Sequence, residues 1–241
     1  MAKSKLAPPK GLTAYSAEDA ANAWARVLLV GPAKSGKSTA VATTAPGPVL
    51  VINGDGNDSL QHASVANADN WHAVNVSNSR EWLAACKWAR GLAEDEKVRT
   101  ISVDTFTLLT QNIQRELKGQ GMDGFALWNT LVDVMMTGMN LLLDAQAHLF
   151  VVCHYFFEND AVGLIPAVST NELRRYMPAK FSEWIWFDVD TTRKGGDKDP
   201  VRAFQIGPSG AWKGACRRGG ASSQRISADV GLLFKTLGIQ E

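Results

Sequence analysis

The fold of the chain is indicated most clearly by one stretch, Arg26-Val27-Leu28-Leu29-Val30-Gly31-Pro32-Ala33-Lys34-Ser35-Gly36-Lys37-Ser38. Its first part is a short aliphatic and β-branched run, which predicts a buried strand that stops at Gly31. The part from Gly31 to Ser38 matches the pattern G-x-x-x-x-G-K-[ST], and a helical pattern follows to about Thr44. A glycine-rich turn between a strand and a helix points backbone N–H groups inward, and the helix start adds partial positive charge. This segment therefore predicts a phosphate-binding site.

The residue types of this Walker A segment predict ATP, or a close analogue, as the ligand, together with Mg²⁺. Lys37 is expected to reach the β- and γ-phosphates, and the Ser38 hydroxyl is expected to ligate the metal. Thr39 would support the helix start and approach the α-phosphate. A glycine-rich turn without a ligand is the alternative. The predicted nucleotide contacts are Gly31, Pro32, Ala33, Lys34, Ser35, Gly36, Lys37, Ser38 and Thr39.

Strand and helix patterns alternate along most of the chain. Further buried strands are predicted at Val49–Ile52, Thr100–Asp104 and Leu149–Cys153, with an edge strand near Ala73–Val76. This alternation predicts an α/β fold with a mostly parallel sheet flanked by helices. Late strands, at Trp184–Asp190 and Val201–Ile206, predict an antiparallel addition, and a last helix is expected from Ala228 to Leu237.

Polar residues follow three of the predicted strands, and ligands of such sheets bind beyond the carboxyl ends of the strands. Asp104 fits the acid that faces Mg²⁺ through a water, so Ser38 and Asp104 are the predicted metal residues. Asp55 can orient the water that attacks the γ-phosphate, although turn chemistry explains it equally well, and Asp58 is the second candidate. His154 can sense the γ-phosphate, and a satisfied histidine at a strand end is the alternative. The predicted catalytic residues are Lys37, Asp55, Asp104 and His154.

Two later segments combine aromatic and basic residues. The stretch from Tyr155 to Phe181 is predicted to be mostly irregular, and its composition suits either single-stranded nucleic acid or a subunit interface. The candidate DNA contacts in it are Tyr155, Phe156, Arg174, Arg175 and Lys180. In an assembly, a later basic group could reach a neighbour's γ-phosphate, with a solvated basic turn as the alternative. The candidates for this trans-acting finger are Lys213, Arg217 and Arg218.

The composition narrows the class of protein. With 241 residues, 45% of them hydrophobic, the chain can bury one sizeable core. We expect a flexible arm at 1–21, a core at 22–190, and a β-extension and helix at 191–241 that pack on it. The net charge is +1, but the segment from Leu173 to Arg225 has 11 Lys/Arg against 5 Asp/Glu, which favours this part as the face for a polyanion.

The cysteines and the apolar stretches point to a soluble protein. Three widely spaced cysteines without a CxxC pair argue against a zinc site and a disulfide framework. The N-terminal residues have no apolar core of a secretory signal. The most apolar stretch, Leu141 to Phe157, is interrupted by polar residues and is too short to span a bilayer. We therefore expect a cytoplasmic protein without a membrane contact.

The order of these motifs resembles the RecA-like P-loop core. More closely, the chain is similar to the small phage-encoded P-loop ATPases of the phage nucleotide-binding and single-strand annealing family. The similarity extends over about Val27 to Gly219 and includes Leu149–His154, Val201–Gln205 and Pro208–Gly210. It implies ATP and Mg²⁺ binding, a homo-oligomer or filament, and recombination on single-stranded DNA in the host cytoplasm, beside a single-stranded-DNA-binding protein.

Two positions depart from that family. The water-activating acid of RecA-like proteins is usually Glu, and Asp55 occupies the matching position. The family's Lys-x-Arg finger is replaced by Cys216-Arg217-Arg218. Three functions therefore remain open: an ATPase that acts on single-stranded DNA, a nucleotide-dependent assembly protein with slow or no hydrolysis, and a small-molecule kinase.

Overall fold

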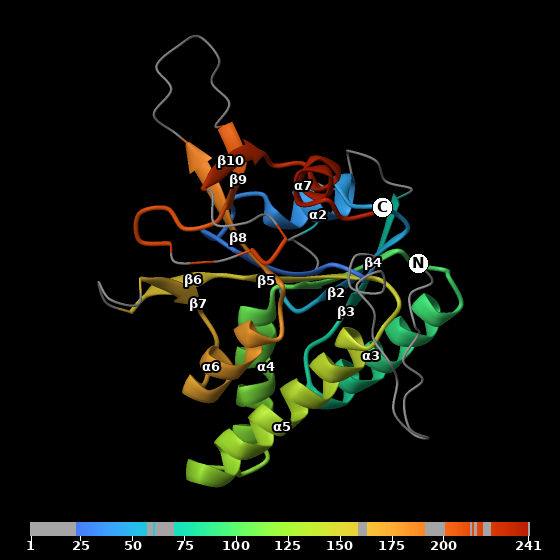
Figure 1. Cartoon of the computed structure of the whole chain (residues 1–241). Coiled ribbons are helices and arrows are strands. Elements are labelled where there is room, and N and C mark those ends of the chain that lie inside the picture. Colours follow the sequence, from blue (N-terminus) through green and yellow to red (C-terminus); the bar gives the residue numbers. More distant parts are fainter. Residues whose placement is uncertain are drawn as a thin grey trace, which may run out of the picture.

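A twisted sheet runs through the centre of the molecule, with helices on both of its faces (Figure 1). The computed structural model describes residues 23–56, 60, 70–158, 163–190, 201–212, 214, 216–218 and 223–240. Within these residues, the large sheet has eight strands in the order β10-β9-β8-β1-β5-β4-β2-β3. The predicted arm at 1–21 lies outside the described residues.

The strands from β3 to β8 in this order are all parallel, and β9 and β10 are added antiparallel to them. The mixed α/β class, the mostly parallel sheet and the antiparallel C-terminal strands are therefore confirmed. The strands are β1 (Arg26–Val30), β2 (Val49–Asn53), β3 (Trp71–Asn75), β4 (Thr100–Asp104), β5 (His148–Cys153), β8 (Glu183–Asp190), β9 (Val201–Ile206) and β10 (Gln224–Ser227).

Alternate residues of the central strands fill two separate cores, because successive side chains of a strand point to opposite faces. Leu28 and Val30 of β1 pack into the core beneath α3, α4 and α5, whereas Val27 and Leu29 pack into the core shared with α2 and α7. Figure 1 shows α3 to α6 on one side of the sheet and α2 and α7 on the other. The helices are α2 (Lys37–Thr44), α3 (Ser79–Glu94), α4 (Phe106–Gly119), α5 (Gly124–Leu143), α6 (Asn171–Ala179) and α7 (Val230–Leu237).

The segment after β5 is more ordered than its sequence predicts. It contains a short hairpin, β6 (Tyr155–Phe157) and β7 (Leu164–Pro166), followed by helix α6. The prediction of a mostly irregular Tyr155–Phe181 segment is therefore wrong. The two strands are too short to show a periodic pattern, and Pro178 in the last turn of α6 resembles a helix breaker. The short strand β10 was also missed, since only Ile226 within it is apolar.

Helix α5 is the one described helix that is long and apolar enough to cross a membrane by length and composition alone. It packs against α3 and α4 and buries Leu127, Leu131, Met135 and Met139 in the core. The core helix of a folded domain passes the same test, and 39% of the apolar stretch of α5 is buried inside the structure.

Candidate functional site

The Gly31–Ser38 loop joins β1 to α2 at the carboxyl edge of the sheet. Gly36 is the residue before α2 and has a φ of 102°, and Lys34 also has a positive φ, of 57°. No side chain caps the start of α2 at Gly36, which leaves its first N–H groups for another acceptor. Gly31 passes so close to β8 that a Cβ atom would lie 2.7 Å from the carbonyl oxygen of Phe187. The glycines are therefore required by the path of the backbone.

The side chain of Lys37 folds back into this loop and is only 4% exposed. Its Nζ donates to the carbonyl oxygen of Gly31 at 3.1 Å and to that of Pro32 at 2.5 Å. Burial lowers the pKa of Lys37 to about 8, against the attraction of Asp104, which acts to raise that pKa. The loop thus holds a cation among carbonyl oxygens, within electrostatic reach of a carboxylate.

Asp104 ends β4 and is 1% exposed. Neither carboxylate oxygen accepts a hydrogen bond within 3.5 Å from any described residue. Burial raises the pKa of Asp104 to about 6, while the nearby Ser38 hydroxyl and Lys37 ammonium act to lower it. The Ser38 hydroxyl is therefore close enough to lower the pKa of the Asp104 carboxylate, although it does not meet the distance and angle required of a hydrogen bond. A buried carboxylate without a partner is costly, and such a group is typical of a ligand site.

Strand β5 lies between β1 and β4, so the residue after β5 emerges between the loop and Asp104. That residue is His154, which is half-buried. Its N–H donates to Thr107 Oγ1 at 3.0 Å. Burial and the Lys37 charge lower the pKa of His154, and the Asp55 charge acts to raise it. These interactions bring Lys37 and His154 into one electrostatic neighbourhood.

Asp55 lies after β2 and its side chain is exposed. Its N–H donates to Asn53 Oδ1 at 3.0 Å, which is the turn chemistry that the sequence left open. Its charge acts to raise the pKa values of both Asp104 and His154, so Asp55 lies within electrostatic reach of both residues. It also lines a pocket of about 500 Å³ at the ends of β2 and β3. Asp58, the second candidate, lies outside the described residues.

The oxygen atoms of Asp104 and Ser38 fit Mg²⁺, which is a hard cation. No group of three or more His, Cys, Asp or Glu side chains that could hold a metal ion occurs among the residues that the structure describes. Mg²⁺ is usually held by one or two carboxylates together with phosphates and waters. The unpartnered carboxylate of Asp104 beside Ser38 is the observation that supports the fit.

Two of the predicted DNA residues lie together on one groove. The guanidinium of Arg174 lies 4.3 Å from the ring centroid of Phe156. Arg115 and Lys118 of α4 line the same groove, whose volume is about 480 Å³. Sequence reasoning missed these two residues, because basic residues on a helix normally indicate a solvated face. We call this feature the α4–α6 groove; its residues are Gln111, Gln114, Arg115, Lys118, Phe156, Ala167, Val168, Ser169 and Arg174.

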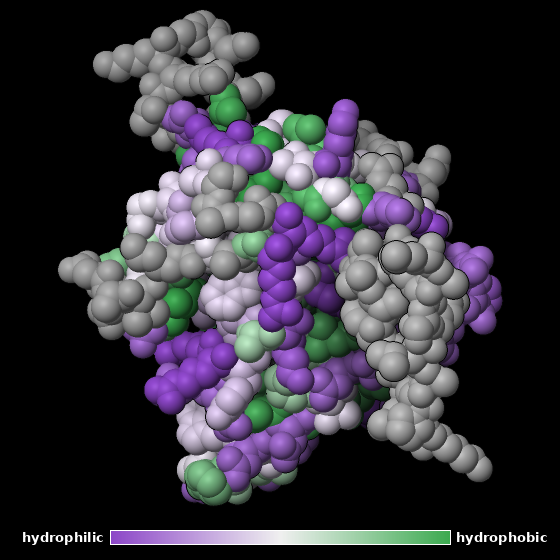
Figure 2. Space-filling view, viewed as in Figure 1, coloured by the Kyte–Doolittle hydropathy of each residue, from purple (hydrophilic) through white to green (hydrophobic). Residues whose placement is uncertain are grey.

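The other predicted DNA residues do not line this groove. Arg175 and Lys180 are on the exposed side of α6 and just after it, and Tyr155 of β6 is 39% exposed. Tyr155 packs edge-on against Trp186 of β8 at a centroid distance of 5.0 Å. Figure 2 shows a strongly hydrophilic surface where α6 lies.

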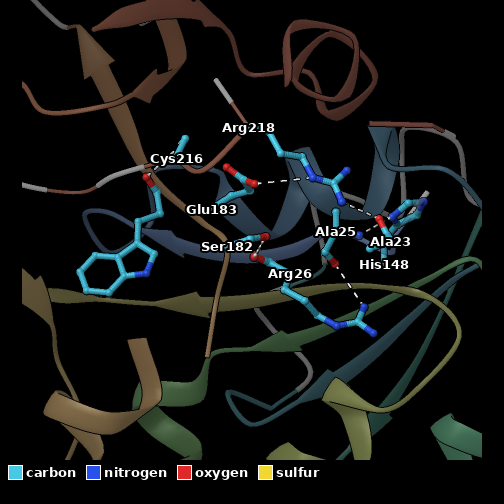
Figure 3. Close-up of polar contacts among 9 residues, drawn as sticks. Ala23, Ala25, Arg26, His148, Ser182, Glu183, Cys216 and Arg218 are labelled. Carbon is cyan, nitrogen blue, oxygen red and sulfur yellow. Dashed lines mark hydrogen bonds and ion pairs between the residues drawn. The ribbon is translucent and has the colours of Figure 1, made fainter. Parts of the chain in front are cut away.

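The candidate finger residues that the structure describes have different surroundings. Arg218 donates through Nη2 to the carbonyl oxygen of Ala23 at 2.7 Å and forms an ion pair with Glu183 (Figure 3). Glu183 pairs with Val27 near the start of β1, so Arg218 lies at the edge of the sheet opposite the loop. Arg217 is exposed, and Lys213 is outside the described residues.

Arg202 is a residue that sequence reasoning did not select. It belongs to β9, yet its Nε donates to the carbonyl oxygen of Ser35 in the loop at 3.0 Å. A Cβ atom on Gly36 would lie 3.0 Å from the same Nε atom. A single arginine near the start of a strand gives no signal of such a contact, because it depends on how β9 is placed in the sheet.

No protein-family model matches the chain, and a search of the curated proteins finds no match.

Proposed function

We propose that this protein binds and hydrolyses ATP with Mg²⁺, through a RecA-like P-loop core, and acts on single-stranded DNA. One observation carries the nucleotide part of this proposal. The buried carboxylate of Asp104 has no hydrogen-bond partner among the described residues, and it lies within electrostatic reach of Lys37 and Ser38. A phosphate chain with its metal ion satisfies all three groups together.

Different groups of the chain would bind different parts of the triphosphate and its metal ion. The uncapped start of α2 offers backbone N–H donors to them. The Lys37 ammonium would exchange the carbonyl oxygens of Gly31 and Pro32 for β- and γ-phosphate oxygens. Ser38 and Asp104 would hold Mg²⁺, which neutralises charge on the phosphates when bound.

The γ-phosphate would face the side of the loop where His154 and Asp55 lie. Asp55 would accept a hydrogen bond from the attacking water and orient it. His154 would sense the γ-phosphate, and its backbone is tied to α4 through Thr107. A movement at His154 would thus reach α4 and the hairpin that follows β5.

The RecA-like core is supported by the strand order β8-β1-β5-β4-β2. In this order, one strand separates the strand of the phosphate-binding loop from the strand of Asp104. The separating strand, β5, ends at the polar residue His154, as the resemblance implies for a sensor. The parallel register from β1 through β5 to β4 brings the three strand ends to one edge.

Single-stranded DNA is supported by the chemistry of the α4–α6 groove. Arg115, Lys118 and Arg174 line it together with Phe156, and no carboxylate is among its described lining residues. None of these three cations forms a salt bridge with a described residue. Cations for phosphates and an aromatic ring for bases are what a single strand requires. We further propose a homo-oligomer or filament in the host cytoplasm, working with a single-stranded-DNA-binding protein.

The test combines nucleotide titration with turnover. Isothermal titration with Mg·ATP should give association for the wild-type protein and at least a tenfold loss for Lys37→Ala, at about 1.4 kcal/mol per tenfold. Phosphate release should rise when a single-stranded oligonucleotide is added. Lys87→Ala, on the exposed side of α3, is the matched control for the loss of one positive charge.

Each negative result removes a different part of the proposal. A folded wild-type protein that gives no heat with Mg·ATP would refute nucleotide binding. Equal turnover with and without the oligonucleotide, and no retention of it at low salt, would refute the DNA part. Association without turnover would instead support a nucleotide-dependent assembly protein.

A small-molecule kinase is the third function that the sequence leaves open, and the pocket beside Asp55 favours it. The pocket has a volume of about 500 Å³ and a polar lining that includes Asn75, Ser77, Glu81 and Asn112. It lies at the proposed γ-phosphate side, where an acceptor hydroxyl would have to enter. Mass analysis of nucleosides and nucleotides incubated with the protein and Mg·ATP would detect phosphate transfer, and unchanged acceptors would reject this candidate.

A further inference from the structure

The two sides of the phosphate-binding loop differ in chemistry. Asp104 ends β4 and His154 follows β5, and both strands lie on one side of β1, with β2 and Asp55 beyond them. Strands β8, β9 and β10 lie on the other side of β1. The phosphate chain separates the γ-phosphate from the nucleoside, so the two ends of the nucleotide lie on opposite sides of the loop. If the γ-phosphate points toward the acids and the histidine, the nucleoside must leave the loop toward β9 and β10.

A cavity of about 500 Å³ is present on that second side. It begins at Lys34 and Gly36 of the loop and continues along α2 past Thr39, the residue expected nearest the α-phosphate. Arg202 of β9 and Ser227 of β10 form its other wall. Its volume is within the range of small-molecule sites, about 300–1,000 Å³. We call it the α2–β9 cavity.

Arg202 is held in place at the entrance of this cavity. Its Nε donates to the Ser35 carbonyl oxygen at 3.0 Å, and its side chain packs against Gly36. Among the described residues, the Nη1 and Nη2 groups of Arg202 have no hydrogen-bond partner, and the guanidinium forms no salt bridge. A planar guanidinium anchored at one atom is suited to stack on an aromatic ring.

We propose that the α2–β9 cavity holds the nucleoside end of the bound triphosphate, with its base stacked on the guanidinium of Arg202. This inference rests on the proposed nucleotide binding and extends it to the recognition of the base. The stacking favours a purine, which has the larger ring face. Arg202 is a positioning residue for the base and takes no part in phosphate transfer.

The test compares two ligands that share the phosphate chain. Mg·ATP has a nucleoside, and magnesium tripolyphosphate has none. For Arg202→Ala, titration calorimetry should show a loss of ATP affinity of about tenfold, within the range for removing one stacking contact, and a change below about twofold for tripolyphosphate. Arg202→Lys keeps the charge without the plane and should lose most of the preference for ATP over CTP. Lys37→Ala should weaken both ligands, and Lys87→Ala should weaken neither.

The outcomes separate this inference from the proposed function. A wild-type protein that binds neither ligand would refute nucleotide binding itself. If the wild type binds both ligands and Arg202→Ala weakens them equally, Arg202 only supports the loop and the nucleoside assignment is wrong. An unchanged ATP affinity in Arg202→Ala would also overturn it. Loss of ATP affinity alone, together with loss of the purine preference, would support it.

Discussion

The Nε atom of Arg218 lies 4.0 Å from Oε1 of Glu183, whose side chain is fully buried at the start of β8. The carboxylate oxygens of Glu183 have no hydrogen-bond partner among the described residues, and the Arg218 guanidinium is the cation that partly compensates their burial. An arginine that the sequence offered as a finger for a neighbouring subunit therefore acts, within its own chain, as the counter-ion of a buried acid (Figure 3).

Replacing Arg218 should destabilise the fold. Arg218→Ala leaves the Glu183 charge buried without a counter-ion, and breaking such a pair costs about 3–5 kcal/mol. Urea denaturation should show this loss, and adding Glu183→Gln to Arg218→Ala should recover a large part of it. Arg217→Ala, with an exposed side chain, should change stability by less than about 0.5 kcal/mol. A stable Arg218→Ala protein that has lost turnover would instead indicate the trans-acting role.

His148 should make the fold sensitive to acid. Burial lowers the pKa of His148 to about 4 from the usual 6.5, and the charges of Arg99, Arg26 and Arg218 act in the same direction. Between these values the unfolded chain binds the proton and the folded protein does not. The contribution of His148 to the free energy of unfolding is therefore fully present above about pH 6.5. It is lost as the pH decreases toward 4, by up to about 3 kcal/mol.

The matched variant for this effect is His148→Asn. The Nδ1 atom of His148 accepts a hydrogen bond from the Ala25 N–H at 3.1 Å, and an asparagine oxygen can replace it as an acceptor. Denaturation midpoints measured from pH 7 to pH 4 should fall less steeply in this variant. The same slope in both proteins would assign the acid sensitivity to other groups.

Gly31 and Gly91 should respond in opposite ways to alanine. A Cβ atom on Gly31 would meet the backbone of Phe187 at 2.7 Å, so Gly31→Ala should cost about 1–3 kcal/mol and disturb nucleotide binding. Gly91 lies within α3 with no atom within 4 Å of its Cβ position, so Gly91→Ala should stabilise the protein by about 1 kcal/mol. Thermal unfolding of both variants checks the prediction, and equal midpoints would contradict it.

Asp55 should be needed for hydrolysis and dispensable for binding. Asp55→Asn removes the proposed base, so phosphate release should fall by about 100-fold or more while the affinity for Mg·ATP stays within about twofold. Asp58→Asn is the comparison. Wild-type turnover in Asp55→Asn would transfer the role to Asp58 or to a neighbouring subunit.

The pH dependence of kcat/KM should be bell-shaped, because this constant reports groups of the free protein. The carboxylate of Asp104 must be ionised, and its pKa of about 6 gives the rising limb. The ammonium of Lys37 must be charged, and its pKa of about 8 gives the falling limb. In Lys37→Arg, which stays charged at high pH, the residual activity should lose the falling limb. A falling limb unchanged in that variant would exclude Lys37 as its cause.

Several parts of the fold could be predicted from local patterns alone. The aliphatic runs at Arg26–Val30, Val49–Ile52 and Thr100–Asp104 are strands in the structure, because a buried parallel strand needs a continuous apolar run. The mostly parallel sheet followed from the alternation of these strands with helices. Asp55, Asp104 and His154 were selected as candidates because the ends of parallel strands meet at one edge, whereas Lys37 was selected from the glycine-rich pattern.

Contacts between distant segments could be found only in the tertiary structure. Arg202 reaches Ser35 across 167 positions of the chain, and Arg115 and Phe156, from two separate elements, line one groove. The sequence by itself determined the strands, the glycine loop and the residue types at the strand ends, because these depend on neighbouring residues. The tertiary structure decided that Arg218 compensates Glu183 and that Arg202 borders the loop, because the order and register of the strands set which side chains meet.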